Sequence, residues 1–277
     1  MQQYIHGFSS EEQDRLVRQA AVLEREVFRG LDLRNASTLL EIGCAVGAEL
    51  QLAGRRWPHL ELTGLDISHS HLEAARHVLA AEIEAGRVTL VEGDAGAMPF
   101  PDDSFDRVMT IWMLEHVADP AAVLAECLRV LKPNGRLICT EVDNATFGFS
   151  PMIPVIMDWW DRFNRFQQQA GGDPFVGPKL SAIAARLNAR DITEEILPII
   201  SSRNEPTRRK ELLDYLDELL ASGADQLRGA DLAAKEDVQA LHEAFQSVRA
   251  DPSVHFQYHA TRLTCRPPEA AREKTVA

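Results

Sequence analysis

A short turn rich in small residues is the first feature of this sequence that could bind a ligand. The segment EIGCAVG, residues 41–47, ends an apolar run and precedes a helical pattern. Glycine allows the backbone to approach a ligand closely, and the free N–H groups at a helix start favour an anionic group. A dinucleotide fingerprint would place glycines at positions 43, 45 and 48, whereas this chain has Gly43, Ala45 and Ala48. The spacing therefore points away from NAD and flavins.

Carboxylates end the next two apolar runs. Asp66 closes the run that begins at Leu60, and its oxygens can accept hydrogen bonds from both hydroxyls of a ribose. Asp94 follows the next run, where a carboxylate suits an exocyclic amino group such as that of adenine. Either acid alone could be an ordinary strand-end residue that caps a loop, and Asp66 alone would also suit NAD. Two acids on successive strands indicate an adenosine without a pyrophosphate.

The elements that must position these residues follow a regular alternation. Apolar runs alternate with amphipathic segments, which is typical of a parallel sheet with helices on both faces. Strands are predicted near residues 38–42, 60–66, 87–91, 105–111 and 135–141. Helices are predicted near 47–57, 69–85 and 119–131, the last with Asp119 as its cap and Pro120 in its first turn. The predicted class is α/β, with a Rossmann-like, doubly wound, mostly parallel sheet.

The flanking sequence extends this core at both ends. Residues 11–30 form an amphipathic leading helix, and residues 147–166 hold most of the aromatic side chains. Strand-like stretches at 191–200 and 254–265 are separated by charged helical segments, so we expect two paired final strands with a helical insertion between them. We divide the chain into a helical lid at 1–34, a cofactor-binding core at 35–145, and capping helices with the final strands at 146–277.

Composition limits the partners and the compartment. A formal net charge of −13 opposes binding to phosphate backbones, so we expect no nucleic-acid partner. Cys44, Cys127, Cys139 and Cys265 have no zinc-ligand spacing, so we expect reduced, buried thiols and no metal. Neither a signal-peptide pattern nor a long apolar run occurs, so we expect a soluble, cytoplasmic protein without a membrane partner.

Four ordered segments resemble the class I S-adenosylmethionine-dependent methyltransferases, especially the small-molecule group similar to ubiquinone and menaquinone biosynthesis enzymes. Together they cover most of residues 38–141, and they read LLEIGCAVG, LTGLDIS, VEGDAGAMPFPDDSFDRVMTIWMLEHV and LRVLKPNGRLICTE.

The resemblance implies S-adenosylmethionine as the cofactor and assigns its contacts residue by residue. Glu41, Gly43 and Gly47 would shape the loop under the methionine part, where Ala45 stands in place of the family's usual glycine. Asp66 would hold the ribose and Ile67 would lie against the adenine. The adenine edge would contact Asp94 and Ala95, and the methionine side would contact Ile111 and Trp112.

Transfer of a methyl group from a sulfonium is an in-line displacement that chiefly requires alignment and exclusion of water. A base is needed only if the acceptor keeps its proton, and the candidates are His116 and Glu141, followed by Asp143, His6 and His259. His116 could equally be a histidine that orients its loop. For the acceptor, the predicted contacts are Tyr4, His6, Trp160 and Phe163. Trp160 and Phe163 lie at helical spacing and could instead simply pack in the hydrophobic core.

The resulting hypothesis is methyl transfer to oxygen, nitrogen or carbon of a small, apolar or aromatic metabolite. Two alternatives stay open. One is an NAD-dependent oxidoreductase on a similar fold. The other is a non-catalytic interaction subunit, which stays open because Ala45 replaces the family's usual glycine. The leading helix and the helical insertion could equally cap the pocket or form a homodimer contact.

Overall fold

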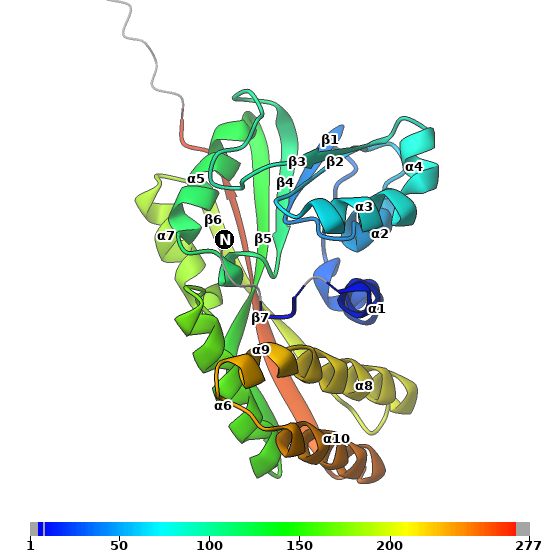
Figure 1. Cartoon of the computed structure of the whole chain (residues 1–277). Coiled ribbons are helices and arrows are strands. Elements are labelled where there is room, and N and C mark those ends of the chain that lie inside the picture. Colours follow the sequence, from blue (N-terminus) through cyan, green and yellow to red (C-terminus); the bar gives the residue numbers. More distant parts are fainter. Residues whose placement is uncertain (1–4, 8, 270–277) are drawn as a thin grey trace, which may run out of the picture.

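The computed structural model describes residues 5–7 and 9–269, and within this range the chain forms a seven-stranded sheet with helices on both faces (Figure 1). The strands lie in the order β3-β2-β1-β4-β5-β7-β6, and the first five are parallel to one another. β7 runs antiparallel to both of its neighbours. The strands are β1 (Thr38–Ile42), β2 (Glu61–Asp66), β3 (Val88–Glu92), β4 (Phe105–Ile111), β5 (Leu131–Ser150), β6 (Arg190–Ile200) and β7 (His255–Arg266). The predicted fold class and the pairing of the last two strands are confirmed.

Two apolar layers hold the helices against the sheet. Successive residues of β1 face opposite layers, since Leu39 packs in one and Leu40 and Ile42 pack in the other. The layer with Leu39 also contains side chains of α1 (Ser10–Val27), α2 (Ala48–Arg56) and α3 (His69–Val78). The opposite layer contains side chains of α5 (Pro120–Val130) and α7 (Leu180–Arg186).

The helix starts follow their sequence signals. Ser9 accepts a hydrogen bond from Glu12 N at the start of α1, and Asp119 accepts from two backbone N–H groups at the start of α5. The expected helix over 69–85 is instead two helices, because the chain leaves helical geometry at Leu79 before α4 (Ala80–Glu84).

The fifth strand is much longer than the predicted 135–141. β5 continues to Ser150 and stays paired with β7 as far as His255, with an irregular register between Asp143 and Gly148. The division placed at 145/146 therefore falls inside one continuous strand. Figure 1 shows this arm of β5 and β7 running down between helices, which are α6 (Pro154–Gln169), α8 (Pro206–Ser222), α9 (Ala224–Gly229) and α10 (Lys235–Ala250). Side chains of the arm and of these helices continue the apolar core that packs on α1, α2 and α3.

No helix in the described part of the chain is both long and apolar enough to cross a membrane.

Candidate active site

A cavity of about 1050 Å³ lies along the carboxyl ends of the parallel strands. Its lining begins at the residues that follow β2 and β3 and extends to side chains of the β5–β7 arm. Helices α1, α6 and α8 supply further parts of the wall. Ligand pockets usually enclose roughly 300–1,000 Å³, so this cavity has room for more than one small ligand.

The turn after β1 has the backbone conformations that its small residues suggested. Gly43 and Gly47 have φ of 69° and 73°, and Ala45 between them has φ of 43°. A side chain at position 43 would collide with Met113. Gly43 and Ala45 line the cavity, whereas Gly47 does not, because it packs against Leu79 where the chain turns into α2. Gly47 therefore shapes the loop without lining the cavity.

Asp66 ties this turn to the end of β2. Its Oδ2 accepts a hydrogen bond from Ala45 N at 2.8 Å, and its Oδ1 accepts one from Ser68 N at 2.8 Å. Each carboxylate oxygen has two lone pairs, so both retain acceptor capacity toward the cavity. Ile67 lies beside it on the cavity wall and is 71% exposed, so its apolar surface is accessible to a ligand.

The other residues assigned to the cofactor also lie on the cavity wall. Asp94 Oδ1 accepts a hydrogen bond from Gly96 N at 2.8 Å, which fixes the carboxylate at the end of β3. Trp112 has φ of 48°, a conformation that bulky residues seldom adopt and that occurs often at functional sites. The remaining two of this group on the wall are Ala95 and Ile111.

Two acidic side chains lie together beneath the turn. Glu41 is 2% exposed, and its Oε2 has no hydrogen-bond partner among the described residues. Burial, with the nearby charges of Glu49 and Asp66, raises the pKa of Glu41, and burial raises that of Glu49 to about 7. Sequence reasoning missed Glu49, because an acid in the first turn of a helix is normally explained by the helix dipole.

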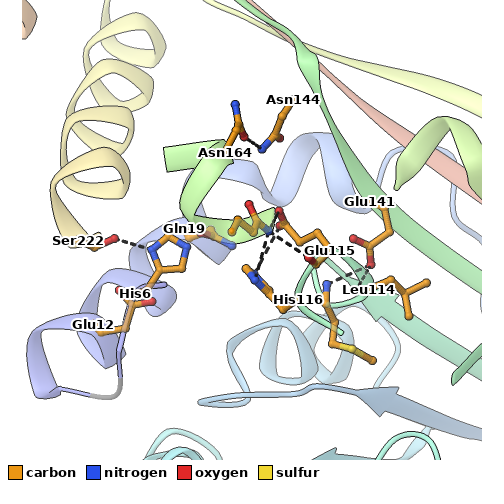
Figure 2. Close-up of polar contacts among 12 residues, drawn as sticks. His6, Glu12, Gln19, Leu114, Glu115, His116, Glu141, Asn144, Asn164 and Ser222 are labelled. Atoms are coloured by element: carbon orange, nitrogen blue, oxygen red, sulfur yellow. Dashed lines mark hydrogen bonds and ion pairs between the residues drawn. The ribbon is translucent and has the colours of Figure 1, made fainter. Parts of the chain in front are cut away.

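Glu141 does not lie where the sequence suggested. It is fully buried and is not part of the cavity wall. Its Oε1 accepts hydrogen bonds from Met113 N at 3.0 Å and Leu114 N at 2.9 Å, as Figure 2 shows for Leu114. Burial and the neighbouring Glu115 raise the pKa of Glu141 to about 8. The prediction of Glu141 as a base at the site needs correction, since its side chain holds the loop after β4 instead.

That loop forms a short helical turn, η1 (Leu114–His116), whose last two side chains line the cavity. Burial raises the pKa of Glu115 to about 7. Burial and the charge of Arg15 lower the pKa of His116 to about 3, so the ring is neutral near pH 7. Gln167 Nε2 lies 2.8 Å from Glu115 Oε2 and 3.4 Å from His116 Nδ1.

The predicted acceptor contacts are partly brought together. Trp160 and Phe163 stack with ring centroids 5.5 Å apart, and His6 lies 5.5 Å from Phe163, all three on the cavity wall. His6 Nδ1 is 2.6 Å from Ser222 Oγ, and burial with the nearby Arg15 lowers its pKa. Tyr4 lies outside the described residues. The structure does not bring Asp143 and His259 to the cavity.

The inner face of α1 carries polar residues that sequence reasoning missed. Arg15 is 3% exposed and donates to both oxygens of Glu12 at 2.6 Å and to Gln19 Oε1 at 2.7 Å. Tyr215 also donates to Gln19 Oε1, at 3.2 Å. Arg15, Gln19 and Tyr215 line the cavity. On α1, polar residues recur at helical spacing beside an apolar stripe. The same pattern is found in helices whose polar face is exposed to solvent, so it did not single out Arg15 and Gln19.

The segment after α6 packs closely against the backbone of η1. Asp173 N donates to Glu115 O at 2.8 Å, and a side chain at Gly172 would collide with that same carbonyl oxygen. A Cβ at Gly177 would lie 2.5 Å from Val142 O. The glycines of this segment therefore allow close backbone packing next to the site. In the described part of the chain, no cluster of His, Cys, Asp and Glu is arranged to hold a metal ion.

Comparison with known proteins identifies a methyltransferase domain in the chain. The family model described as a methyltransferase domain matches residues 40–139. Demethylmenaquinone methyltransferase of Symbiobacterium thermophilum is 35% identical over 146 residues, which cover 49% of this chain and 58% of that protein. The enzyme of the same name from Staphylococcus aureus strain JH9 is 31% identical over 162 residues, which cover 58% and 64%. These alignments span less than two thirds of either relative.

Solved structures share the fold at lower identity. Phosphoethanolamine N-methyltransferase 2 of Haemonchus contortus, solved with phosphomonomethylethanolamine and S-adenosylhomocysteine, superimposes with a TM-score of 0.58 at 19% identity, covering 95% of this chain and 58% of that one. The [4+2]-cyclase SpnF superimposes with a TM-score of 0.55 at 22% identity, covering 92% and 81%. Residues 40–139 are thus a methyltransferase domain, and the chain as a whole shares the fold of these solved structures.

Proposed function

We propose that this protein transfers a methyl group from S-adenosylmethionine to a small, apolar or aromatic acceptor. The observation that carries the proposal is the continuity of one cavity, whose wall extends from Asp66 and Asp94 at the sheet edge to the aromatic side chains Trp160 and Phe163 of α6. A shared cavity lets a donor and an acceptor meet without solvent between them.

The residues at the sheet edge fit the cofactor. Glu41 Oε2, buried without a hydrogen-bond partner among the described residues, suits the ammonium of an amino-acid group. Asp66 keeps lone pairs for ribose hydroxyls, and the exposed Ile67 beside it offers an apolar surface to adenine. Asp94 suits the adenine amino group. When bound, the cofactor supplies an activated methyl group and a sulfur leaving group.

Charge and shape support an apolar acceptor. Trp160 and Phe163 give the cavity a flat aromatic wall. Among the described residues that line the cavity, Arg15 is the sole Arg or Lys, and Glu12 offsets its charge. A phosphorylated acceptor would need more positive charge than this. The relatives named demethylmenaquinone methyltransferases are consistent with an apolar acceptor.

Two features count against the alternative of an NAD-dependent oxidoreductase: the glycine spacing at residues 43–47 and the match to a methyltransferase domain. The proposal also includes a cytoplasmic location, supported by four buried free cysteines that suit a reducing compartment.

Calorimetry with S-adenosylhomocysteine tests the cofactor assignment. Asp66→Asn replaces an acceptor oxygen with a donor next to two backbone N–H groups and weakens the ribose contact. We expect roughly 10- to 100-fold weaker binding, as for loss of a hydrogen bond to a charged group. The control Asp225→Asn removes the same charge from an exposed acid on α9 and keeps the wild-type affinity. Folded wild-type protein that binds neither S-adenosylmethionine nor S-adenosylhomocysteine would disprove the proposal.

A further inference from the structure

Glu115 is a carboxyl group on the cavity wall, in the loop that follows β4. It belongs to η1, directly after β4, and it is 8% exposed. Its neighbours on the wall include His116 on one side and Met113 on the other, and it shares the cavity with the aromatic pair Trp160 and Phe163. A side chain in this position can contact an acceptor that binds against these aromatic rings.

Gln167 fixes the Glu115 carboxyl group from outside the cavity. Its Nε2 is 3.2 Å from the backbone oxygen of Glu115 and 2.8 Å from Oε2. The backbone oxygen can only accept, so the amide nitrogen must be the atom that faces Glu115. Gln167 is itself buried and absent from the cavity wall. One carboxylate oxygen is therefore held by the amide, while Oε1 lies 3.6 Å from His116 Nε2.

The other candidate bases are less suited to accept a proton here. His116 is a weak base here, because burial and the charge of Arg15 lower its pKa to about 3. Glu141 is turned away from the cavity and bonded to backbone N–H groups. Glu41 and Glu49 lie under the turn that follows β1. Asp119 also lines the cavity, but its side chain caps α5, and Glu115 is therefore the candidate base.

We propose that Glu115 accepts the proton of the acceptor during methyl transfer and that Gln167 is the residue that positions it. This inference rests on the proposed function. The acceptor's bond to hydrogen breaks and the proton passes to a Glu115 oxygen. The electron pair left on the acceptor forms the bond to the methyl carbon, and the pair of the broken methyl–sulfur bond stays on sulfur. Glu115 then returns the proton to solvent when the products leave.

The surroundings of Glu115 favour this role near neutral pH. Burial raises its pKa to about 7, while Gln167 and Arg15 of α1 act in the opposite direction. Glu141 of β5 is mostly protonated near pH 7, since burial and the charge of Glu115 raise its pKa to about 8, and His116 is neutral. Tyr215 of α8 and Tyr258 of β7 also feel its charge and stay protonated, since burial raises both pKa values. A base is most effective when its pKa lies near the working pH.

The first test measures the pH dependence of methyl transfer to naphthalene-1,4-diol, a probe that keeps its protons near neutral pH. Wild-type turnover should rise with pH through about 7 and then level off, because Glu115 must be ionised. Glu115→Gln should lower turnover by roughly 10²- to 10⁴-fold and abolish that rise. Gln167→Ala removes a donor to the carboxylate and should move the rise to higher pH. Glu141→Gln, a matched buried acid off the cavity, should keep the inflection.

The second test does not depend on turnover. In the S-adenosylhomocysteine complex, Glu49 and Glu141 also contribute to the infrared carbonyl stretch of protonated carboxyl groups. The wild-type spectrum minus that of Glu115→Gln should therefore contain one band that titrates near pH 7, and the spectrum of Glu141→Gln should retain that band. Absence of the band from the difference spectrum overturns the proposal, and so does an unchanged pH profile. Loss of S-adenosylhomocysteine binding in Glu115→Gln would overturn it too, by assigning Glu115 to the cofactor site. Failure of the wild type to bind that ligand would instead refute the proposed function.

Discussion

Ala45 shows how one residue can depart from a family pattern while its loop keeps its shape. The left-handed conformation at φ 43° costs an alanine roughly 1 kcal/mol or more relative to glycine. The hydrogen bond from Ala45 N to Asp66 Oδ2 opposes that cost. The neighbouring Gly47 has no such freedom, because a Cβ there would lie 2.5 Å from Leu79 Cδ1.

A pair of substitutions tests this contrast. Ala45→Gly should change the free energy of unfolding by less than about 1 kcal/mol, because relief of strain offsets the greater entropy of the unfolded chain. Gly47→Ala should lower it by about 1–3 kcal/mol through the clash and the strained φ. Denaturant unfolding measures both. A loss of more than about 2 kcal/mol in Ala45→Gly would contradict this account of the loop.

At the scale of elements, the site depends on contacts between segments that are distant in sequence. Backbone atoms of the segment after α6 pack against η1 and against β5, at Glu115 O and Val142 O. α1 contributes Arg15 to the same cavity from about a hundred residues before η1. The position of Glu115 is therefore set by β4, α6 and the segment between α6 and η2 (Gly177–Lys179).

Gly172→Ala tests this bracing. The added methyl group would collide with Glu115 O, which cannot retreat without moving η1. We expect a loss of about 1–3 kcal/mol in stability and a larger fall in methyl transfer than in S-adenosylhomocysteine affinity. Gly148→Ala in β5, where a Cβ meets nothing within 4 Å, should be neutral or slightly stabilising. Equal behaviour of the two variants would argue against a role for close packing at Gly172.

For the whole molecule, the enclosed cavity leaves several ionisable groups with shifted pKa values. Burial raises the pKa of Glu49, Glu115 and Glu141 to about 7, 7 and 8. The folded state therefore holds protons that the unfolded chain has released, and stability falls as pH rises from about 4.5 toward 8. Burial lowers the pKa of His6 and His116, so their contribution is lost as pH falls below 6.5. The two effects oppose each other below pH 6.5, and above it only the carboxyl effect remains.

We therefore expect the ligand-free protein to lose stability between pH 6.5 and 8.5. Glu141 alone should contribute about 2 kcal/mol to this loss, since one pKa unit corresponds to about 1.4 kcal/mol. Glu141→Gln should show a shallower decline, because an amide has no proton to release and its oxygen can still accept from Met113 N and Leu114 N. Thermal unfolding across this pH range measures both proteins, and parallel slopes would contradict the assignment.

The sequence alone determined the features that depend on local pattern. Alternating apolar runs predicted the parallel core, because a strand buried on both faces needs consecutive apolar residues. Glycine positions and strand-end acids predicted the turn after β1 and the placement of Asp66 and Asp94 on one edge, because carboxyl ends of parallel strands meet there.

Only the tertiary structure decided which side chains enter the cavity. Glu141 and Glu115 are both acids near strand ends, yet one binds backbone N–H groups and the other lines the cavity. That difference depends on how β5 packs against the loop after β4, which no local pattern encodes. Arg15 reaches the cavity, and Gln167 reaches Glu115, through packing of α1 and α6 over long sequence separations. Such contacts are selected by burial of the whole apolar core, and local sequence spacing does not specify them.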